Sequence, residues 1–158
     1  MSALKACFMF SVGLLLLSAC ANITVEPGHS VLLPPDSADS LRTLCSRPGL
    51  PAFQSTWQPS ATDIAEMESQ FGQLKHVSAS QCCIPGARIR DVNKYYRQYV
   101  GIAVHDKKLI YINAYPIGSE QGLRSKVVAA CDGGTGYWGV LYDVESHRFF
   151  DLAVNGLA

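Results

Sequence analysis

Cys131 and the glycines that follow it form the segment of this sequence best suited to covalent chemistry. In the run Cys131-Asp132-Gly133-Gly134 a thiol stands beside backbone amides that can favour a thiolate, and His147 could serve as its base. The cysteine and the histidine are far apart in the chain, and no motif of a cysteine hydrolase surrounds either of them. A structural disulfide at the end of a tight turn is therefore the favoured interpretation, with an enzyme centred on Cys131 as the alternative.

Phosphate, metal and paired-carboxylate chemistry have less support. Gly133–Gly136 lacks the Lys-Ser/Thr ending of a phosphate-binding loop, and a strand pattern rather than a helical one follows it. Glu66 and Glu68 point to different faces of a predicted helix, so they do not form a glycosidase pair. No two histidines have the spacing of metal ligands; they are His29, His76, His105 and His147. We expect neither a metal ion nor a cofactor.

Residues 1–19 have the pattern of an export signal. Lys5 gives a positive start, an apolar stretch covers Phe8–Leu17, and Ser18 and Ala19 are small. The stretch is about ten residues long, too short to span a bilayer as a helix. The run Leu17-Ser18-Ala19-Cys20 resembles the lipobox of bacterial lipoproteins. The alternative is a plain secretory signal cleaved near Ala19 or Ala21.

The lipobox resemblance implies that Cys20 is acylated and becomes the first residue of the mature chain. Acyl chains would then hold the protein on a membrane. Ala21, rather than an aspartate, follows the cysteine. In the lipoproteins that this segment resembles, such a residue implies the outer membrane, with the domain facing the periplasm.

The remaining cysteines form the covalent framework expected of the domain. The disulfide candidates are Cys45, Cys82, Cys83 and Cys131. In an oxidising compartment four cysteines favour two disulfides, and three pairings are possible. A Cys82–Cys83 bridge would be strained, because adjacent residues lie closer than the usual separation. We therefore expect Cys45 to pair with one of this doublet and Cys131 with the other.

Length and charge limit the function classes. The chain has 158 residues, with 13 Lys and Arg against 13 Asp and Glu. A neutral chain argues against a general nucleic-acid binder, which needs a cationic surface. Its length is that of one domain, which we place at residues 36–158 after a lipidated tether at 20–35. Within that tether, the apolar Val31-Leu32-Leu33 could instead pack on the domain.

Helical signals occur in the first half of the domain. A short helix is predicted between Asp36 and Cys45, and prolines and a glycine follow it before a loop that extends to Pro59. The clearest helix begins at Ser60, with Asp63 in the position of a capping-box acid. An apolar stripe follows at helical spacing; its members are Ile64, Met67, Phe71 and Leu74.

The second half has strand periodicity. Tyr95–His105 and Leu109–Tyr115 are predicted to form a hairpin. Lys126–Cys131, Tyr137–Asp143 and Arg148–Val154 would complete an antiparallel sheet of about five strands. The sequence therefore predicts a disulfide-bonded α+β domain with one main amphipathic helix packed on the sheet.

Aromatic side chains are frequent in the predicted strands. Tyr95, Arg97 and Tyr99 share one face of their strand, and Tyr111 and Trp138 are candidates for the same surface. Aromatic residues with arginine are typical of recognition patches, although tyrosines also suit half-buried strands. A basic run is a second candidate contact, for an acidic partner; it comprises Arg88, Arg90, Lys94 and Arg97.

These features together favour a lipid-anchored binding protein without catalysis. Its partner would be an envelope protein, a cell-wall component, or a hydrolase or toxin that it inhibits, and not a nucleic acid. The domain is also similar to small uncharacterised bacterial envelope lipoproteins, a similarity that implies no activity. It rests on Cys131-Asp-Gly-Gly, Tyr137-Trp-Gly, Tyr142-Asp and Asn155-Gly.

Overall fold

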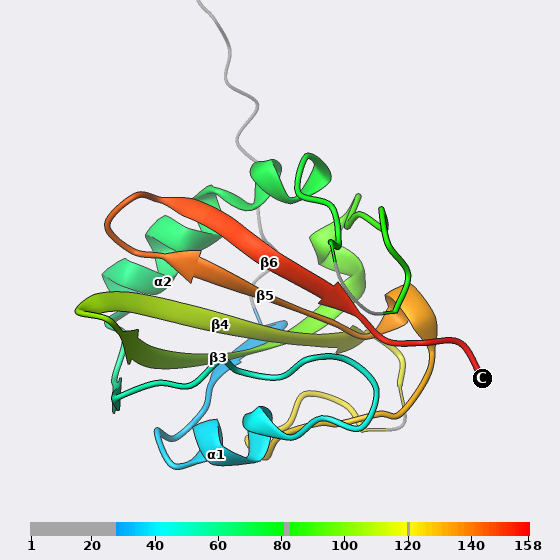
Figure 1. Cartoon of the computed structure of the whole chain (residues 1–158), viewed down its shortest axis with the longest axis horizontal. Coiled ribbons are helices and arrows are strands. Elements are labelled where there is room, and N and C mark those ends of the chain that lie inside the picture. Colours follow the sequence, from blue (N-terminus) through cyan, green and yellow to red (C-terminus); the bar gives the residue numbers. More distant parts are fainter. Residues whose placement is uncertain (1–27, 81–82, 120) are drawn as a thin grey trace, which may run out of the picture.

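A six-stranded, mostly antiparallel sheet forms the centre of the molecule, seen in a computed structural model that describes residues 28–80, 83–119 and 121–158 (Figure 1). The export signal, the lipobox with Cys20, the first part of the tether and Cys82 lie outside these residues. The predicted α+β class and the disulfide bonding are confirmed. The elements are β1 (Ser30–Leu32), α1 (Ser37–Arg42), β2 (Ser55–Trp57), α2 (Ala61–Ser69), η1 (Phe71–Lys75), η2 (Val92–Lys94), β3 (Tyr95–Val104), β4 (Lys107–Pro116), η3 (Gly134–Gly136), β5 (Trp138–Asp143) and β6 (Arg148–Val154).

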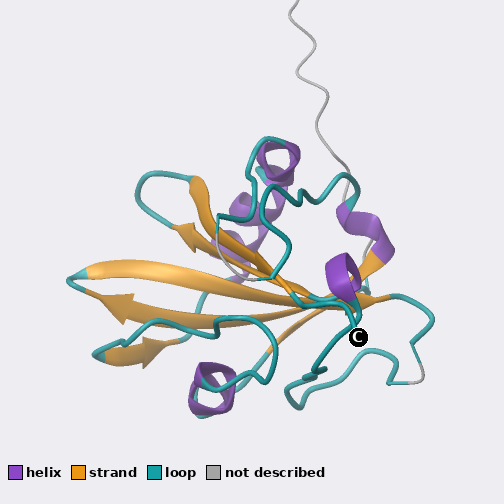
Figure 2. Cartoon of the chain, turned by 45° about the vertical axis from the view of Figure 1, so that its right-hand side comes forward, coloured by secondary structure: helices purple, strands orange, loops and turns teal. Residues whose placement is uncertain are grey.

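Both faces of the sheet are covered. Figure 2 shows α1 on one side of the strands and α2 with the 3₁₀ helix η1 on the other. Each face has its own apolar cluster, because successive side chains of a strand point to opposite faces. Tyr99, Ile112 and Trp138 belong to the cluster beneath α2, whereas Val100 and Tyr111 belong to the cluster beneath α1. The sheet therefore presents no open aromatic face.

The helix predicted from Ser60 is present, but it is divided into two shorter helices. Ser60 Oγ accepts from the Asp63 backbone N–H, and the Asp63 carboxylate accepts in return from the Ser60 N–H, which confirms the capping box. The α-helix ends at Ser69, and the chain continues as η1. Met67 and Phe71 are buried, as the stripe predicted, so the two short helices together supply one apolar face.

The predicted hairpins are confirmed, with one turn shifted. β3 and β4 pair along their whole length, and His105 and Asp106 form the turn with positive φ angles of 46° and 65°. Such angles suit two-residue hairpin turns, because their twist matches that of the strands. The turn was expected at Asp106–Lys108, so it begins one residue earlier than predicted and is one residue shorter. The strand from Arg148 to Val154 has the predicted bounds.

Two short strands extend the sheet beyond the prediction. β1 pairs parallel with the first part of β3, and β2 pairs antiparallel with its last part. The expected tether is therefore wrong at its end, and the alternative that its apolar residues pack on the domain is correct, with Leu33 only 1% exposed. A segment predicted as loop is therefore an edge strand, because β2 pairs with β3. The indole N–H of Trp57 also donates to the Ile102 carbonyl at 3.1 Å.

The strand predicted at Lys126–Cys131 is wrong. This segment crosses the α1 face of the sheet, and side-chain amides take the place of a strand ladder. Gln98 donates to the Lys126 carbonyl at 2.6 Å, Asn113 to the Val128 carbonyl at 2.9 Å, and Asn155 to the Ala130 carbonyl at 2.7 Å. Buried backbone groups need partners, and amide side chains supply them here.

The expected disulfide pairing is also wrong, because Cys45 is bonded to Cys131. Asn155 lies between the two segments that carry these cysteines. Its side chain accepts from Arg47, two residues after Cys45, and donates to the carbonyls on either side of Cys131. Cys83 is disulfide-bonded as well.

Candidate functional site

The aromatic surface expected on the sheet is buried. Arg97, Tyr99, Tyr111 and Trp138 have exposures of 0%, 1%, 3% and 0%, so the expectation that they face solvent is wrong. Only Tyr95 is half-buried, with its ring against Trp138 and its hydroxyl donating to the Thr135 carbonyl. The physical reason is the second covering layer, since β-sheets with helices on both faces bury alternate side chains on each side.

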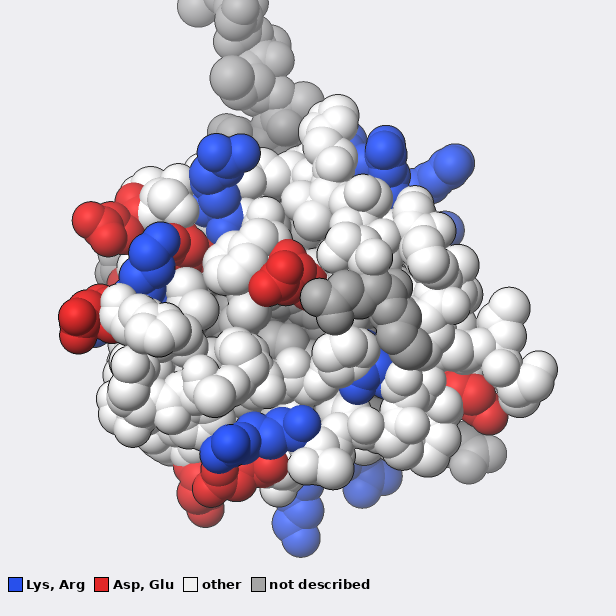
Figure 3. Space-filling view, in the orientation of Figure 1, with Lys and Arg blue, Asp and Glu red and all other residues white. Residues whose placement is uncertain are grey.

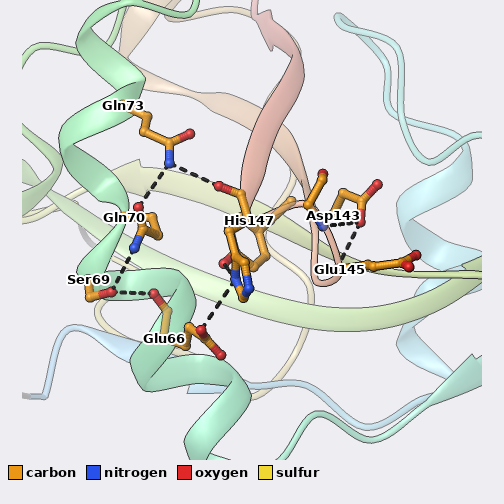
Figure 4. Close-up of polar contacts among 9 residues, drawn as sticks. Glu66, Ser69, Gln70, Gln73, Asp143, Glu145 and His147 are labelled. Atoms are coloured by element: carbon orange, nitrogen blue, oxygen red, sulfur yellow. Dashed lines mark hydrogen bonds and ion pairs between the residues drawn. The ribbon is translucent and has the colours of Figure 1, made fainter.

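Cys131 and His147 do not meet. The disulfide to Cys45 occupies the Cys131 sulfur, and His147 lies in the β5–β6 turn, where it contacts α2 (Figure 4). Its Nδ1 is 3.0 Å from the Tyr142 hydroxyl and 3.3 Å from Glu66 Oε1. The predicted alternative of a Cys131 thiol enzyme therefore has no support in this geometry.

The contacts of His147 fasten a turn to a helix. Gln73 donates to the His147 carbonyl at 2.9 Å, and Asp143 accepts from the backbone N–H groups of Glu145 and Ser146 (Figure 4). Burial, with the nearby carboxylates of Glu66 and Asp143, raises the pKa of Tyr142 to about 12, so its hydroxyl stays protonated. We interpret this cluster as a structural link that holds the β5–β6 turn against α2.

A hollow lined by basic residues is the strongest candidate for recognition. It lies beside the end of η1 and has a volume of about 700 Å³. We call it the basic hollow; its lining is Lys75, His76, Gly86, Ala87, Arg88 and Arg90. In Figure 3, Lys and Arg side chains gather over the loop that follows η1. Every charged side chain of the lining is thus basic.

The loop that shapes the hollow is fixed by its own backbone. The N–H of Ala79 donates to the Ala87 carbonyl at 2.9 Å, and the N–H of Gly86 donates to the Ala79 carbonyl at 2.8 Å. Ala79 and Ile89 are each 2% exposed and anchor the loop in the core beneath α2. Arg88 and Arg90, which flank Ile89, are consequently exposed.

The basic run predicted from sequence is divided by the fold. Arg88 and Arg90 line the hollow, whereas Arg97 is buried under α2 and Lys94 lies in η2. The predicted basic run did not include Lys75 and His76, because these two residues lie at the end of η1, earlier in the chain than Arg88. Among the residues that the structure describes, none of the ion pairs uses Lys75, Arg88 or Arg90.

Neither a metal centre nor a membrane span is found in the described part of the chain. No three His, Cys, Asp or Glu side chains gather there as possible ligands. No helix within 28–80, 83–119 and 121–158 has the length and apolar character needed to cross a membrane.

Comparison with known proteins gives no further assignment. No family model, curated protein or solved structure matches the chain.

Proposed function

We propose that this protein is a lipid-anchored, non-catalytic binding protein that holds a polyanionic component of the bacterial envelope in the basic hollow. The observation that carries the proposal is the lining itself, in which four basic side chains surround one concavity and no acidic side chain takes part. The chain as a whole is neutral. Attraction of an anion must therefore come from this local concentration of charge.

The arrangement of the basic side chains favours phosphate groups as ligands. Arg88 and Arg90 stand on the two sides of a buried residue, and Lys75 approaches from a separate element. Guanidinium groups bind phosphate oxygens in a bidentate manner, while an ammonium group acts as a point charge. The ligand class that fits is a polymer or glycolipid carrying phosphate groups, rather than a flat acidic protein surface.

The lipid anchor gives the binding site its place in the cell. We propose that acylation of Cys20 holds the domain on the outer membrane, facing the periplasm, on the strength of the lipobox resemblance. Residues 21–27 would then connect the lipid to a folded domain that begins before β1. Anchoring both domain and ligand in one envelope raises their effective concentration, so that modest affinity suffices.

Binding of inorganic polyphosphate tests the proposal. Full-length protein in mild detergent is titrated with the polymer, and the double variant Arg88→Glu/Arg90→Glu is compared with Lys126→Glu/Arg148→Glu. Both variants change the net charge equally, but only the first alters the hollow. We expect the first variant to lower affinity by at least tenfold and to reduce the salt dependence of binding, because fewer counterions are released.

The control variant distinguishes binding in the basic hollow from a general effect of the net charge. It should bind within about threefold of the original protein, since a pair of exposed charges away from the site acts only through screened, long-range attraction. Equal losses in both variants, or no binding of the original protein, would refute the basic hollow as the recognition site.

A further inference from the structure

The described chain enters the domain at one end of the β3–β4 hairpin. Gly28 precedes His29, whose carbonyl accepts from the Arg97 backbone N–H, and β1 then runs parallel to the first part of β3. Tyr95 and Pro116 are register partners, so β3 begins and β4 ends at this same end of the sheet. The loop that follows β4, yellow in Figure 1, starts here as well.

Aromatic rings link the entering chain to this loop. The His29 ring lies edge-on to Tyr96, with 5.6 Å between the ring centroids, and the Tyr96 ring lies 5.6 Å from that of Tyr115. The Tyr115 hydroxyl donates to the Gly122 carbonyl at 2.9 Å and accepts from the Arg124 backbone N–H at 3.1 Å. These two bonds fix this part of the loop to a ring that is itself fully buried.

The loop presents an exposed leucine among basic side chains. Leu123 is 39% exposed, one of two large hydrophobic residues that are exposed in the described part of the chain. Arg124 and Lys126 are exposed as well, and they line a hollow of about 280 Å³ whose charged residues are all basic. Lys94 is exposed and lies next to the loop, because its carbonyl accepts from the Ile117 N–H. We call Lys94, Leu123, Arg124 and Lys126 the entry surface.

Basic residues outnumber acidic ones around the entry surface. None of the ion pairs between described residues uses its three cations. Asp91 is an acidic neighbour, and its carboxylate accepts from the backbone N–H of Asn93. Glu120 belongs to the same loop in the sequence but lies outside the described residues. The excess of positive charge favours an anionic surface over a neutral one, and an exposed leucine can enter the apolar boundary of a membrane.

The short tether places this end of the domain nearest to the lipid. Eight steps along the chain separate Cys20 from Gly28. An extended chain covers at most about 3.6 Å for each step, or roughly 29 Å in all. A domain of this length is roughly 35 Å across. The acyl chains on Cys20 would therefore lie closer to the entry surface than to the β3–β4 turn at the opposite end of the sheet.

We propose that the entry surface docks on the anionic phospholipid headgroups of the membrane that holds the acyl chains. This inference rests on the acylation of Cys20 proposed above. Arg124 and Lys126 bind headgroup phosphates, and Leu123 inserts at the boundary between headgroups and acyl chains. Docking then fixes the orientation of the domain on the membrane, instead of leaving the domain free to rotate about its tether.

Quenching of an added tryptophan tests the docking. The full-length lipidated protein is reconstituted into vesicles of phosphatidylglycerol with brominated acyl chains, which quench tryptophans that reach the bilayer. Leu123→Trp is compared with Ser146→Trp, an exposed position in the β5–β6 turn at the opposite end of the sheet. The unsubstituted protein supplies the signal of the native tryptophans. We expect at least threefold greater loss of the added fluorescence in Leu123→Trp, and equal losses at the two positions would overturn the docking.

Charge reversal tests the basic residues of the entry surface in the Leu123→Trp background. Arg124→Glu/Lys126→Glu should reduce the quenching at least twofold, because anionic headgroups attract basic residues close to the membrane. The matched control Arg88→Glu/Arg90→Glu, in the basic hollow, should leave the quenching unchanged. Brominated phosphatidylcholine vesicles, which carry no net charge, should quench Leu123→Trp less. Equal quenching in the two kinds of vesicle, or in the two charge variants, would overturn the assignment to an anionic surface.

Flotation of the same vesicles separates failure of the docking from failure of the proposed function. Unsubstituted protein that does not float with the vesicles would refute the lipid anchor, and the docking with it. Protein that floats while Leu123→Trp stays unquenched would refute the docking alone. Polyphosphate binding in detergent reports on the basic hollow and is independent of both results.

Discussion

The Tyr99 hydroxyl donates a 2.6 Å hydrogen bond to Glu68 Oε1, joining the centre of the sheet to helix α2. The same hydroxyl accepts from Arg97 Nε at 3.0 Å, so it connects a buried guanidinium to the carboxylate. Burial raises the pKa of Tyr99, which keeps the donor proton in place. Residues that resemble a recognition patch in the sequence thus form an internal polar link.

Replacing Tyr99 by Phe should destabilise the protein by about 1.5–3 kcal/mol, because hydrogen bonds to charged groups contribute about that much. The substitution also leaves Arg97 without its link to Glu68. Urea denaturation measures the change. Tyr95→Phe is the matched control, since its hydroxyl forms an exposed hydrogen bond, and it should cost less than about 1 kcal/mol. A Tyr99→Phe protein of unchanged stability would contradict the internal link.

Asp143 should make stability depend on pH in the acid range. Burial acts to raise the pKa of Asp143, but hydrogen bonds from the Ser146 and Glu145 N–H groups and from Lys107 outweigh it and hold the pKa below its ordinary value. Because the folded pKa is depressed, the stabilisation is fully present above the unfolded value of about 4 and is lost as pH falls through the folded pKa.

The variant Asp143→Asn tests this dependence. It should lower the free energy of unfolding by about 1 kcal/mol at neutral pH, through loss of the ion pair with Lys107. The difference from the original protein should shrink below about pH 4, where the carboxylate becomes protonated. Asp106→Asn, at an exposed turn position that asparagine also tolerates, is the control and should leave the free energy of unfolding at neutral pH unchanged. A difference that persists at low pH would contradict the assignment.

The Cys45–Cys131 bond should be recovered by peptide mapping. Proteolysis without reduction is expected to yield the peptide of Cys45 linked to that of Cys131, and not to the peptide of Cys83. Replacing both cysteines by serine opens a loop with a sequence separation of 86 residues. The chain-entropy model then predicts a loss of up to about 4.6 kcal/mol in the free energy of unfolding, measured by urea denaturation.

Replacing Cys20 by Ser should release the protein from membranes, if the lipobox is used as its resemblance implies. The experiment compares membrane and soluble fractions of cells that produce either form. Acyl chains contribute about 0.8 kcal/mol for each buried CH₂ group to membrane binding. Without them, the proposed anchor has no other interaction of similar strength with the membrane. A variant that still requires detergent for extraction would count against lipidation.

Local signals in the sequence determined several elements correctly. The capping box at Ser60, the apolar stripe through Met67, and the bounds of β6 follow from patterns within a few residues of each other. Such patterns are reliable because capping and alternation act between neighbours in the chain. The same information could not reveal β1 or β2, which become strands only because β3 offers them an edge.

The sites depended on contacts between distant parts of the chain. Tyr99 and Arg97 alternate as an exposed face would, yet α2 covers them, and Lys75 reaches the hollow of Arg88 and Arg90 from another element. Asn155 hydrogen-bonds to both of the remote segments that carry the bonded cysteines Cys45 and Cys131. The sequence by itself determined the start of α2, the β3–β4 hairpin and the bounds of β6, and it determined which residues carry charge. Only the tertiary structure decided which of those residues meet solvent, because burial depends on which segments pack together.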